Sequence, residues 1–452
     1  MLVMTAVLIA GIGCGSGAGP DSSSASVTSS GPGRASAAKR HKRPAAWPTY
    51  HANLARTGVD TTSPALGAFH RTWSRQFDGL LYAEPLAVGS RVYVATENNT
   101  VYALNARSGH VAWKRHLGTP TQGSTLPCGN IEPVSGITGT PAISGGTIYA
   151  VAFVNGRHVL FGLRLHGGKV RLKHNVDAPG SDPSVHQERA ALSVSNGRVY
   201  VPYGGLAGDC GNYKGRVVSV MTRGKPKRRV FTVGVHREGG IWAPSGAAVD
   251  GSGNLFVATG NGDSSGFDYG NAVLRLSPKL AQTDFFRVTN AGQENQTDKD
   301  LGSVGPTLIS GDRLFAIGKD GIGLVLSAGH LGGVGGQLFS KAVCLGGGFG
   351  GLAYQAPFVY VPCSNGLYAV QMSGNSFNVT WHTGSSAGPP IVAGGVVWSI
   401  DSGATLHGYA PDSGSPVASV DLGSVTHFPT PAAGGGRLFA PAGNQVIAFA
   451  GV

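Results

Sequence analysis

The sequence has few charged residues, few acids and no long apolar run. Charged residues make up 13% of the 452 positions, against about 25% in ordinary globular proteins. With only 23 Asp and Glu residues, no compact acidic cluster emerges that would predict a metal site. No run of eighteen apolar residues occurs, so the sequence predicts no membrane-spanning helix. None of the five cysteines forms a C-x-x-C motif, which argues against a zinc centre or a thiol redox motif.

The positive charge is large, but it is not arranged for nucleic-acid binding. The formal net charge is +12, and much of it lies in two short segments, residues 34–43 and 223–229. No basic stripe with interleaved aromatic residues is present, so we expect no nucleic-acid partner. We expect the first segment to rest on anionic membrane headgroups and the second to be a solvated hairpin tip.

Glycine is present in excess, at 73 residues. Each glycine in a helix costs roughly 1 kcal/mol relative to alanine, which excludes a helical bundle or a coiled coil. The hydrophobic share of 41% is too high for a disordered chain. The composition therefore predicts a large β-rich protein with many tight turns.

The N-terminus has the composition of an export signal followed by a tether. Residues 1–13 are apolar and lead into Cys14, and residues 15–38 are almost entirely Gly, Ala, Ser and Pro. The pattern resembles a bacterial lipoprotein signal, which predicts a signal over residues 1–14, lipid attachment at Cys14 and a tether over residues 15–46. Plain secretion and an uncleaved anchor are the alternatives. Each of the three places the protein outside the cytoplasm.

A four-stranded unit recurs eight times along the rest of the chain. Such a repeat is typical of an eight-bladed β-propeller, because a single blade cannot bury both of its apolar faces alone. We expect an all-β propeller of antiparallel blades over residues 47–452, with residues 69–77 supplying the outer strand of the last blade. The aromatic residues that mark the eight units are Tyr93, Tyr149, Tyr200, Phe256, Phe315, Tyr360, Trp398 and Phe439.

The repeat resembles a known family. Residues 103–113, ALNARSGHVAW, look like the tryptophan-docking motif of quinoprotein alcohol dehydrogenases. The unit VYVATENNTVYALNARSGHVAW is similar to repeats of pyrroloquinoline quinone (PQQ)-binding-like propellers, and residues 47–60, 239–262 and 298–306 resemble further segments of such proteins. This superfamily includes the dehydrogenases and the non-catalytic outer-membrane assembly lipoprotein BamB.

In such a ring the long connections gather at one end, which we call the loop face. Connections between blades and turns between the second and third strands of a blade both lie there, because neighbouring strands are antiparallel. Binding sites on a rigid scaffold usually lie in such loops. The same geometry predicts two disulfides at this face, Cys128 with Cys210 and Cys344 with Cys363.

The axial channel is expected to open at the loop face. Residues at the loop-side entry of the innermost strands should form its rim. They are Tyr82, Glu84, Thr138, Gln187, Glu188, Arg189, Trp242, Asp300, Phe349 and His427. His427 and His186 are expected to face solvent.

The resemblance to the quinoproteins implies PQQ and Ca²⁺ as cofactors. It implies that Glu188 or Glu84 supplies a metal ligand, Asp300 a catalytic base, Trp242 a flat floor and Arg189 a contact to the quinone carboxylates. The alcohol dehydrogenases of the family often carry a ring between adjacent cysteines near the quinone, and this chain has no adjacent cysteines.

Two functions follow from these observations. The favoured one is a non-catalytic, lipid-tethered scaffold at the cell envelope that binds a protein, peptide or glycan through the loop face. The alternative is a PQQ- and Ca²⁺-dependent dehydrogenase of alcohols or sugars. The sequence does not name the partner or ligand.

Overall fold

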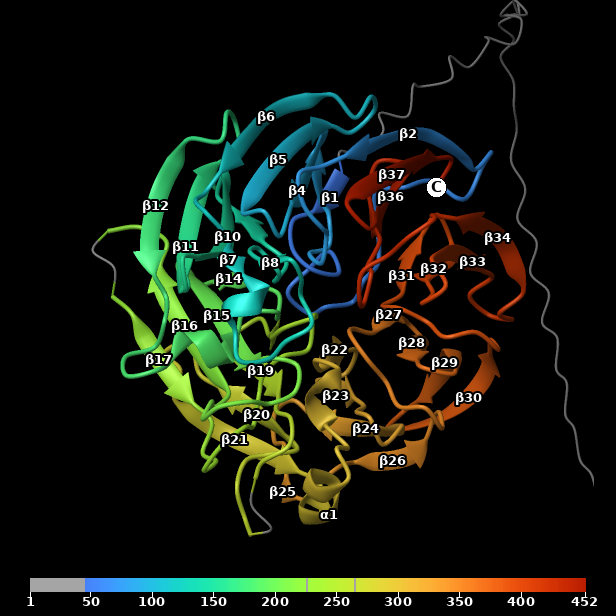
Figure 1. Cartoon of the computed structure of the whole chain (residues 1–452). Coiled ribbons are helices and arrows are strands. Elements are labelled where there is room, and N and C mark those ends of the chain that lie inside the picture. The colour runs from blue at the N-terminus through green and yellow to red at the C-terminus, as the bar shows by residue number, and fades with distance from the viewer. Residues whose placement is uncertain (1–44, 225–226, 264–265) are drawn as a thin grey trace, which may run out of the picture. The chain divides into compact units, whose positions relative to one another are not determined.

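The structure is a computed structural model that describes residues 45–224, 227–263 and 266–452. The predicted signal, Cys14 and almost all of the predicted tether lie outside these residues. The described chain forms eight small antiparallel sheets arranged in a ring around a common axis (Figure 1). The prediction of an eight-bladed, all-β propeller is confirmed. Among the described residues, no helix is long and apolar enough to cross a membrane.

The eight blades follow one another along the chain, and each runs from an innermost strand near the axis to an outermost strand at the rim. In that order the strands are β3(Leu86–Gly89), β4(Arg91–Ala95), β5(Thr100–Asn105) and β6(Val111–His116); β9(Ala142–Ser144), β10(Thr147–Val154), β11(Arg157–Arg164) and β12(Val170–Asn175); β14(Ser193–Ser195), β15(Arg198–Gly205), β16(Arg216–Met221) and β17(Arg229–Thr232); β18(Ala248–Val249), β19(Leu255–Ala258), β20(Ala272–Leu276) and β21(Gln282–Arg287); β22(Thr307–Ile309), β23(Arg313–Ala316), β24(Ile322–Ser327) and β26(Phe339–Ala342); β27(Ala353–Gln355), β28(Phe358–Cys363), β29(Gly366–Ser373) and β30(Ser376–His382); β31(Ile391–Ala393), β32(Val396–Ile400), β33(Thr405–Tyr409) and β34(Pro416–Asp421); and β35(Ala432–Ala433), β36(Arg437–Ala442), β37(Gln445–Ala450) and β2(His70–Gln76).

Short elements complete the fold. The strand β1(Ala45–Trp47) adds to the inner edge of the first blade, β13(His186–Gln187) pairs with β15, and β25(Gly333–Val334) adds in parallel to β21. A small hairpin is formed by β7(Thr121–Gln122) and β8(Val134–Ser135). The helical turns are η1(Gly123–Thr125), η2(Pro183–Val185), α1(Ala291–Gln296) and η3(Leu301–Ser303).

The middle strands form the core because neighbouring blades cover both of their faces. The strand β5 is buried along almost its whole length, whereas the outermost strand β6 is mostly exposed. A strand covered on two faces has a continuous apolar run instead of an alternating one. This pattern explains why the sequence is rich in Val and Ala yet has few charges.

Tryptophan side chains link consecutive blades. Trp113 packs on Gly168 of the next blade and donates a hydrogen bond from Nε1 to the carbonyl of Leu165 (2.9 Å). An ideal Cβ on Gly168 would lie 2.6 Å from the Trp113 ring, and its φ of +64° also favours glycine. The tryptophan of the docking motif at residues 103–113 thus packs on the neighbouring blade. The same arrangement joins Trp73 to Gly109 and Trp381 to Gly414.

The ring is closed by an N-terminal strand. Residues 70–76 form β2, which pairs antiparallel with β37 at the outer edge of the last blade. In Figure 1 the blue strand β2 lies beside the red strands β36 and β37. The expectation that this segment closes the propeller is confirmed.

The segment before β2 runs along the inner strands of the whole ring. Its backbone carbonyls, in chain order from Pro48 to Gly58, accept hydrogen bonds from inner-strand amides of five blades. The donor–acceptor pairs are Ile143–Pro48, Val249–Leu54, Leu308–Ala55, Tyr354–Thr57 and Val392–Gly58, at 2.7 to 3.0 Å. The segment therefore ties blades that are far apart in sequence.

Arg56 is the centre of this axial segment and is completely buried. Its guanidinium donates to the carbonyls of Tyr50, Leu192 and Ala247 and to the hydroxyls of Thr49 and Ser193. Burial lowers the pKa of Arg56 to about 10. The five hydrogen bonds satisfy the buried cation without a direct carboxylate contact.

Candidate functional site

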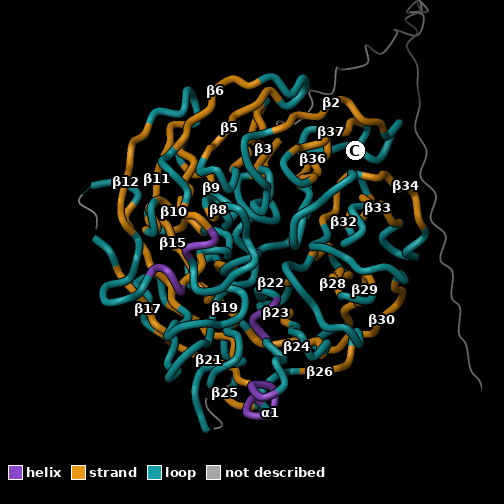
Figure 2. The backbone as a smooth tube through the Cα atoms, in the orientation of Figure 1, coloured by secondary structure: helices purple, strands orange, loops and turns teal. Residues whose placement is uncertain are grey.

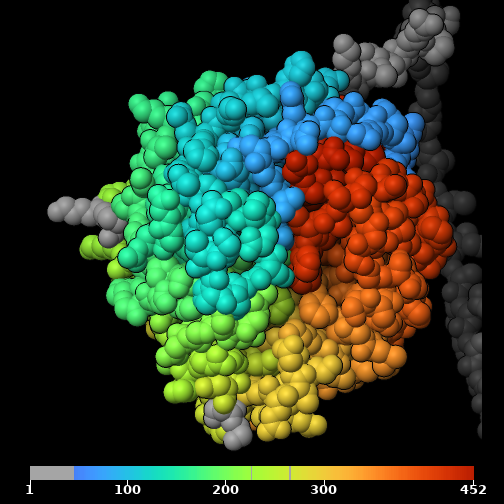
Figure 3. All heavy atoms as spheres, in the orientation of Figure 1, coloured from blue at the N-terminus to red at the C-terminus, as the bar shows by residue number. Residues whose placement is uncertain are grey.

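A cavity of about 370 Å³ opens at the loop face near the axis. Loops fill the centre of the ring (Figure 2), and the teal loop before β9 lies over this face (Figure 3). The size is within the range of small-molecule sites. The lining residues come from the third, fourth and fifth blades and from connections between blades. They are Asn130, Gln187, Arg189, Gly205, Leu206, Ala207, Gly208, Asp209, Tyr213, Glu238, Trp242, Asn261, Asp298, Asp300, Lys319, Phe349, His427 and Phe428.

A partly buried ion pair lines the cavity, with Asp300 buried and Lys319 half-buried. Lys319 Nζ lies 2.5 Å from Asp300 Oδ2 and 2.7 Å from Asp298 Oδ1. The other oxygen of Asp300 accepts the backbone N–H of Asn261 at 2.6 Å. Burial raises the pKa of Asp300 despite the lysine, and the two aspartates raise the pKa of Lys319 against its own desolvation. The pair holds a carboxylate whose pKa lies above its usual range, as a general base requires.

Aromatic rings and a second cation also line the cavity. Lys319 Nζ lies 5.8 Å from the centroid of the Trp242 ring. Arg189 lies between the Tyr82 and Phe428 rings, with its Cζ 5.2 and 5.1 Å from their centroids. Its Nη2 donates to the carbonyl of His427 at 3.0 Å. Among the described residues, Arg189 forms no ion pair with a carboxylate. This cation is therefore free to bind an anionic ligand.

Further acidic side chains lie around the mouth. The hydroxyl of Tyr213 donates to Asp209 Oδ1 at 2.5 Å, and Glu238 forms an ion pair with Arg237. Burial raises the pKa of Glu238. In the described part of the chain, no three His, Cys, Asp or Glu side chains are grouped to hold a metal ion. The oxygen-bearing side chains around the mouth therefore do not form an assembled metal site among the described residues.

Two residues proposed as metal ligands lie outside the cavity lining. Glu84 is buried and accepts hydrogen bonds from Trp47 Nε1 (3.0 Å) and from the His51 amide (2.9 Å) of the axial segment. Glu188 is 4% exposed, and its Oε1 has no hydrogen-bond partner. Burial, with a contribution from the nearby Glu97, raises the pKa of Glu188 well above its usual value. The structure thus brings Arg189, Trp242 and Asp300 together but does not place Glu84 or Glu188 with them.

Some of the other residues predicted at the channel rim line the cavity, and some do not. Gln187, Phe349 and His427 line the cavity, whereas Tyr82 and Thr138 do not. The expectation that His186 faces solvent is wrong. The ring is 4% exposed and its Nδ1 donates to the Asp182 carbonyl at 2.7 Å, because the turn η2 folds it inward.

Sequence reasoning missed several residues of the cavity. Lys319 lies in a short Gly-Lys-Asp-Gly turn between β23 and β24, and Asp209 precedes Cys210 in the turn between β15 and β16. Both belong to turns of the kind expected at the loop face. Their position in loop-face turns was the sequence signal that could have identified them as site residues. Neither residue belongs to a motif that distinguishes it from other turn residues.

Both predicted disulfides are present. Cys128 bonds to Cys210, next to the lining residue Asp209, and Cys344 bonds to Cys363. The pairing predicted from strand order is confirmed. The fold and site together define an eight-bladed propeller with a polar, aromatic-walled axial cavity.

Comparisons with known proteins agree with this class. Residues 70–225 match the family model described as outer membrane protein assembly factor BamB. The chain is 27% identical over 130 residues to a polyvinylalcohol dehydrogenase from a Pseudomonas species, a match that covers 28% of this chain and 19% of the relative. The chain therefore spans about a fifth of the length of that relative.

Solved structures show the same fold at low sequence identity. A quinohemoprotein alcohol dehydrogenase from Pseudomonas putida aligns with a TM-score of 0.74 and 14% identity, covering 90% of this chain and 80% of the other. BamB from Moraxella catarrhalis aligns with a TM-score of 0.58 and 14% identity, covering 85% and 100%. The matches are consistent with the PQQ-like propeller family that the repeats indicated.

The cavity fits a planar anionic quinone better than it fits a metal. The indole of Trp242 and the ring of Phe428 supply flat apolar surface, and Arg189 supplies a buried cation with no carboxylate ion pair among the described residues. These features suit an aromatic carboxylate such as PQQ. For Ca²⁺, the described residues offer Asp209, Glu238 and Asn261 only as separate oxygen donors.

Proposed function

We propose that the protein is an oxidoreductase that binds a PQQ-type quinone in the axial cavity and oxidises alcohols. The observation that carries this proposal is the partly buried Asp300–Lys319 pair beside Trp242. Asp300 would accept the proton of the substrate hydroxyl, and Lys319 would fix the orientation of its carboxylate. When bound, the quinone supplies a two-electron acceptor, so that an alcohol becomes an aldehyde or ketone.

The other wall residues would bind and orient the ligand. Arg189 would pair with a carboxylate of the quinone, since charge-assisted hydrogen bonds from a guanidinium to a carboxylate are strong and directional. Trp242 would pack against the ring system. Polymeric and small alcohols are both candidate substrates, because the relatives include a polyvinylalcohol dehydrogenase and an alcohol dehydrogenase.

The test combines binding and turnover. Purified protein is titrated with PQQ by calorimetry, with and without Ca²⁺, and then assayed for dye-linked oxidation of small alcohols and polyvinyl alcohol. We expect Asp300→Asn to keep PQQ binding but to lower turnover by about 10²- to 10⁴-fold. The matched control is Asp401→Asn, a carboxylate of similar burial that pairs with His407 in the turn between β32 and β33, outside the cavity lining. Absence of both PQQ binding and turnover in the wild type would refute the proposal.

A second candidate is a non-catalytic scaffold at the cell envelope, bound to the membrane through a lipid on Cys14. The match of residues 70–225 to the BamB model favours it, and the two disulfides agree with an oxidising compartment. The partner would be an envelope protein, peptide or glycan held at the loop face. This candidate gains support if the protein binds no PQQ and the lipidated chain co-purifies with an envelope partner that is released by loop-face substitutions.

A further inference from the structure

We propose that a disulfide-closed glycine loop, residues 344–350, is a clamp that positions the Asp300–Lys319 pair, with Ser303 as its locking residue. The inference rests on the proposed function, because the clamp would position the side chains that the proposed reaction uses. The contacts that carry it are backbone hydrogen bonds, two serine hydroxyl bonds and a disulfide, none of which involves a cofactor. We call residues 344–350 the clamp loop.

Three backbone segments are stacked at the ion pair. The turn that carries Lys319 lies against the segment that carries Asp300, and the Lys319 amide donates to the Asp300 carbonyl at 2.9 Å. An ideal Cβ on Gly318 would lie 2.5 Å from that same carbonyl oxygen. A side chain at residue 318 would therefore separate the two segments. The ion pair of the side chains is thus built on a direct backbone contact.

The clamp loop covers the other side of the Lys319 turn. The Gly348 amide donates to the Gly318 carbonyl at 2.9 Å, and an ideal Cβ on Gly347 would lie 2.7 Å from Lys319 Cα. Gly347 has a φ of +74°, which favours glycine. The Lys319 turn is therefore held between the Asp300 segment and the clamp loop, with glycine at each close approach.

Ser303 locks the outer two segments to each other. Its side chain is fully buried, and its Oγ donates to the Gly348 carbonyl at 2.7 Å. The Asp300 carbonyl is a second acceptor, 3.1 Å from the same Oγ. The Gly350 amide donates to the Ser303 carbonyl at 2.9 Å. Ser303 belongs to the turn η3 directly after Asp300, so its bonds fix the segment from which the carboxylate projects.

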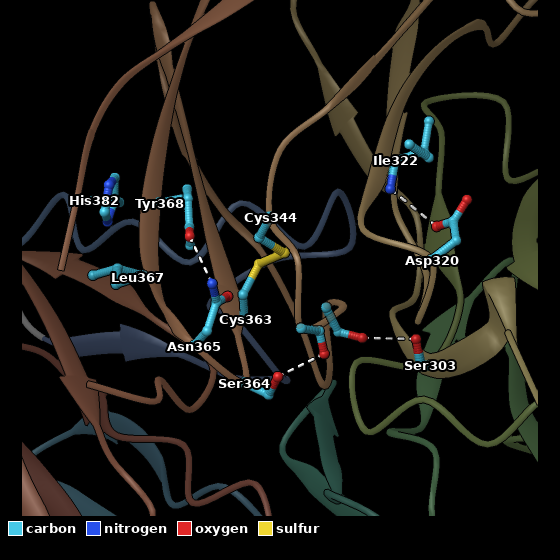
Figure 4. Close-up of a disulfide and its surroundings, with 12 residues drawn as sticks. Ser303, Asp320, Ile322, Cys344, Cys363, Ser364, Asn365, Leu367, Tyr368 and His382 are labelled. Carbon is cyan, nitrogen blue, oxygen red and sulfur yellow. Dashed lines mark hydrogen bonds between the residues drawn. A yellow bond between two sulfur atoms is a disulfide. The ribbon is translucent and has the colours of Figure 1, made fainter. Parts of the chain in front are cut away.

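The disulfide anchors the clamp loop to the next blade. Cys344 at the start of the loop is bonded to Cys363 at the end of β28, and Ser364 Oγ donates to the Gly346 carbonyl at 2.6 Å. Figure 4 shows the disulfide and, below it, the hydrogen bonds that Ser364 and Ser303 make to the loop. Both cysteines are buried, at 6% and 1% exposure. We infer that this bridge serves geometry and not thiol exchange.

The test measures the ion pair in the ligand-free protein. A double-mutant cycle with Asp300→Asn and Lys319→Met gives the coupling between the two side chains from denaturant unfolding. The cycle is repeated in the Cys344→Ala/Cys363→Ala background and in the Ser303→Ala background. The matched control is Cys128→Ala/Cys210→Ala, which removes the other disulfide and leaves the clamp loop bridged.

We expect the coupling, expressed as a ratio of unfolding constants, to fall by about threefold or more in both clamp backgrounds and to stay unchanged in the control. An unchanged coupling in the clamp backgrounds would overturn the inference. An equal fall in the control would also overturn it, because the effect would then be general loosening. If the double cysteine variant does not fold, Ser303→Ala, which keeps the disulfide, decides.

The proposed reaction supplies a second readout. If the protein turns over alcohols with PQQ, Ser303→Ala should lower kcat more than it changes KM and should shift the pH profile of turnover. A protein without turnover would refute the oxidoreductase proposal but leave the coupling result interpretable. The two failures are therefore distinguishable.

Discussion

Burial of Glu97 makes the stability of the propeller depend on pH. The side chain is 1% exposed. Its Oε2 accepts hydrogen bonds from the Gly136 amide (2.5 Å) and the Thr138 hydroxyl (3.1 Å), whereas its Oε1 has no partner. Burial outweighs these two hydrogen bonds and raises the pKa of Glu97 from 4.5 to about 7. The folded protein therefore binds a proton on Glu97 more tightly than the unfolded chain does.

The sign and size of the effect follow from linkage. Because the folded pKa is the higher one, the contribution to stability is fully present below about pH 4.5 and is lost as the pH rises through about 7. For these two pKa values, the free energy of unfolding should fall by about 2.5 kcal/mol between pH 5 and pH 8 on account of this residue. Glu188 acts in the same direction, since burial also raises its pKa.

The assay compares the wild type with Glu97→Gln by denaturant unfolding at several pH values from 5 to 8. The amide does not titrate, so the variant should gain stability relative to the wild type as the pH rises, by about 2.5 kcal/mol over this range. Glu132→Gln, on an exposed loop, is the control and should keep the wild-type pH profile. A difference between wild type and Glu97→Gln that does not change with pH would refute the reasoning.

Three further predictions concern stability and are read from denaturant unfolding at constant pH. Gly168→Ala should destabilise the protein by about 2 to 3 kcal/mol, because the added methyl group meets the docked indole ring and φ is positive. The control Gly146→Ala has a φ of +74° but open space around it, so it should cost only about 1 kcal/mol. Equal losses of stability in the two variants would contradict the docking explanation. Arg56→Met should destabilise by about 3 kcal/mol or more, since buried acceptors lose a charged donor, and Arg56→Lys should not restore the loss. Removing the disulfide with a sequence separation of 82 should cost about 4 to 5 kcal/mol, and removing the one with a separation of 19 about 3 kcal/mol, in the chain-entropy model; the reverse order would show that native contacts dominate.

The repeat was sufficient to predict the ring, because each blade is a local unit with its own turn and packing residues. Register followed from the aromatic positions, and loop-face geometry followed from the antiparallel order of the strands. The disulfide pairing of Cys128 with Cys210 and of Cys344 with Cys363 was predicted in the same way, since it depends only on which connections share one end.

The site could be predicted only in part, because its partners come from segments without a repeat. Asp300 was identified at the rim, but Lys319 comes from the next blade unit and has no motif of its own. Glu84 was expected at the channel, yet the axial segment takes up its carboxylate through Trp47 and His51. The path of that segment along the inner strands is set by tertiary packing and not by any local pattern.

Two of the buried guanidinium groups, those of Arg56 and Arg189, show why the cavity is suited to a ligand. Arg56 and Arg189 are both buried, and an arginine side chain carries five N–H donors. Arg56 makes five hydrogen bonds inside the protein, so it has structural partners for its donors. Within the described part of the chain, Arg189 makes one hydrogen bond, to a backbone carbonyl. The two aromatic rings beside it stabilise its positive charge but accept no directional hydrogen bond from its N–H groups. A buried cation that lines a cavity and has few protein hydrogen bonds among the described residues is stabilised when an anion enters, which is why we place the carboxylate of the ligand at Arg189 and not at Arg56.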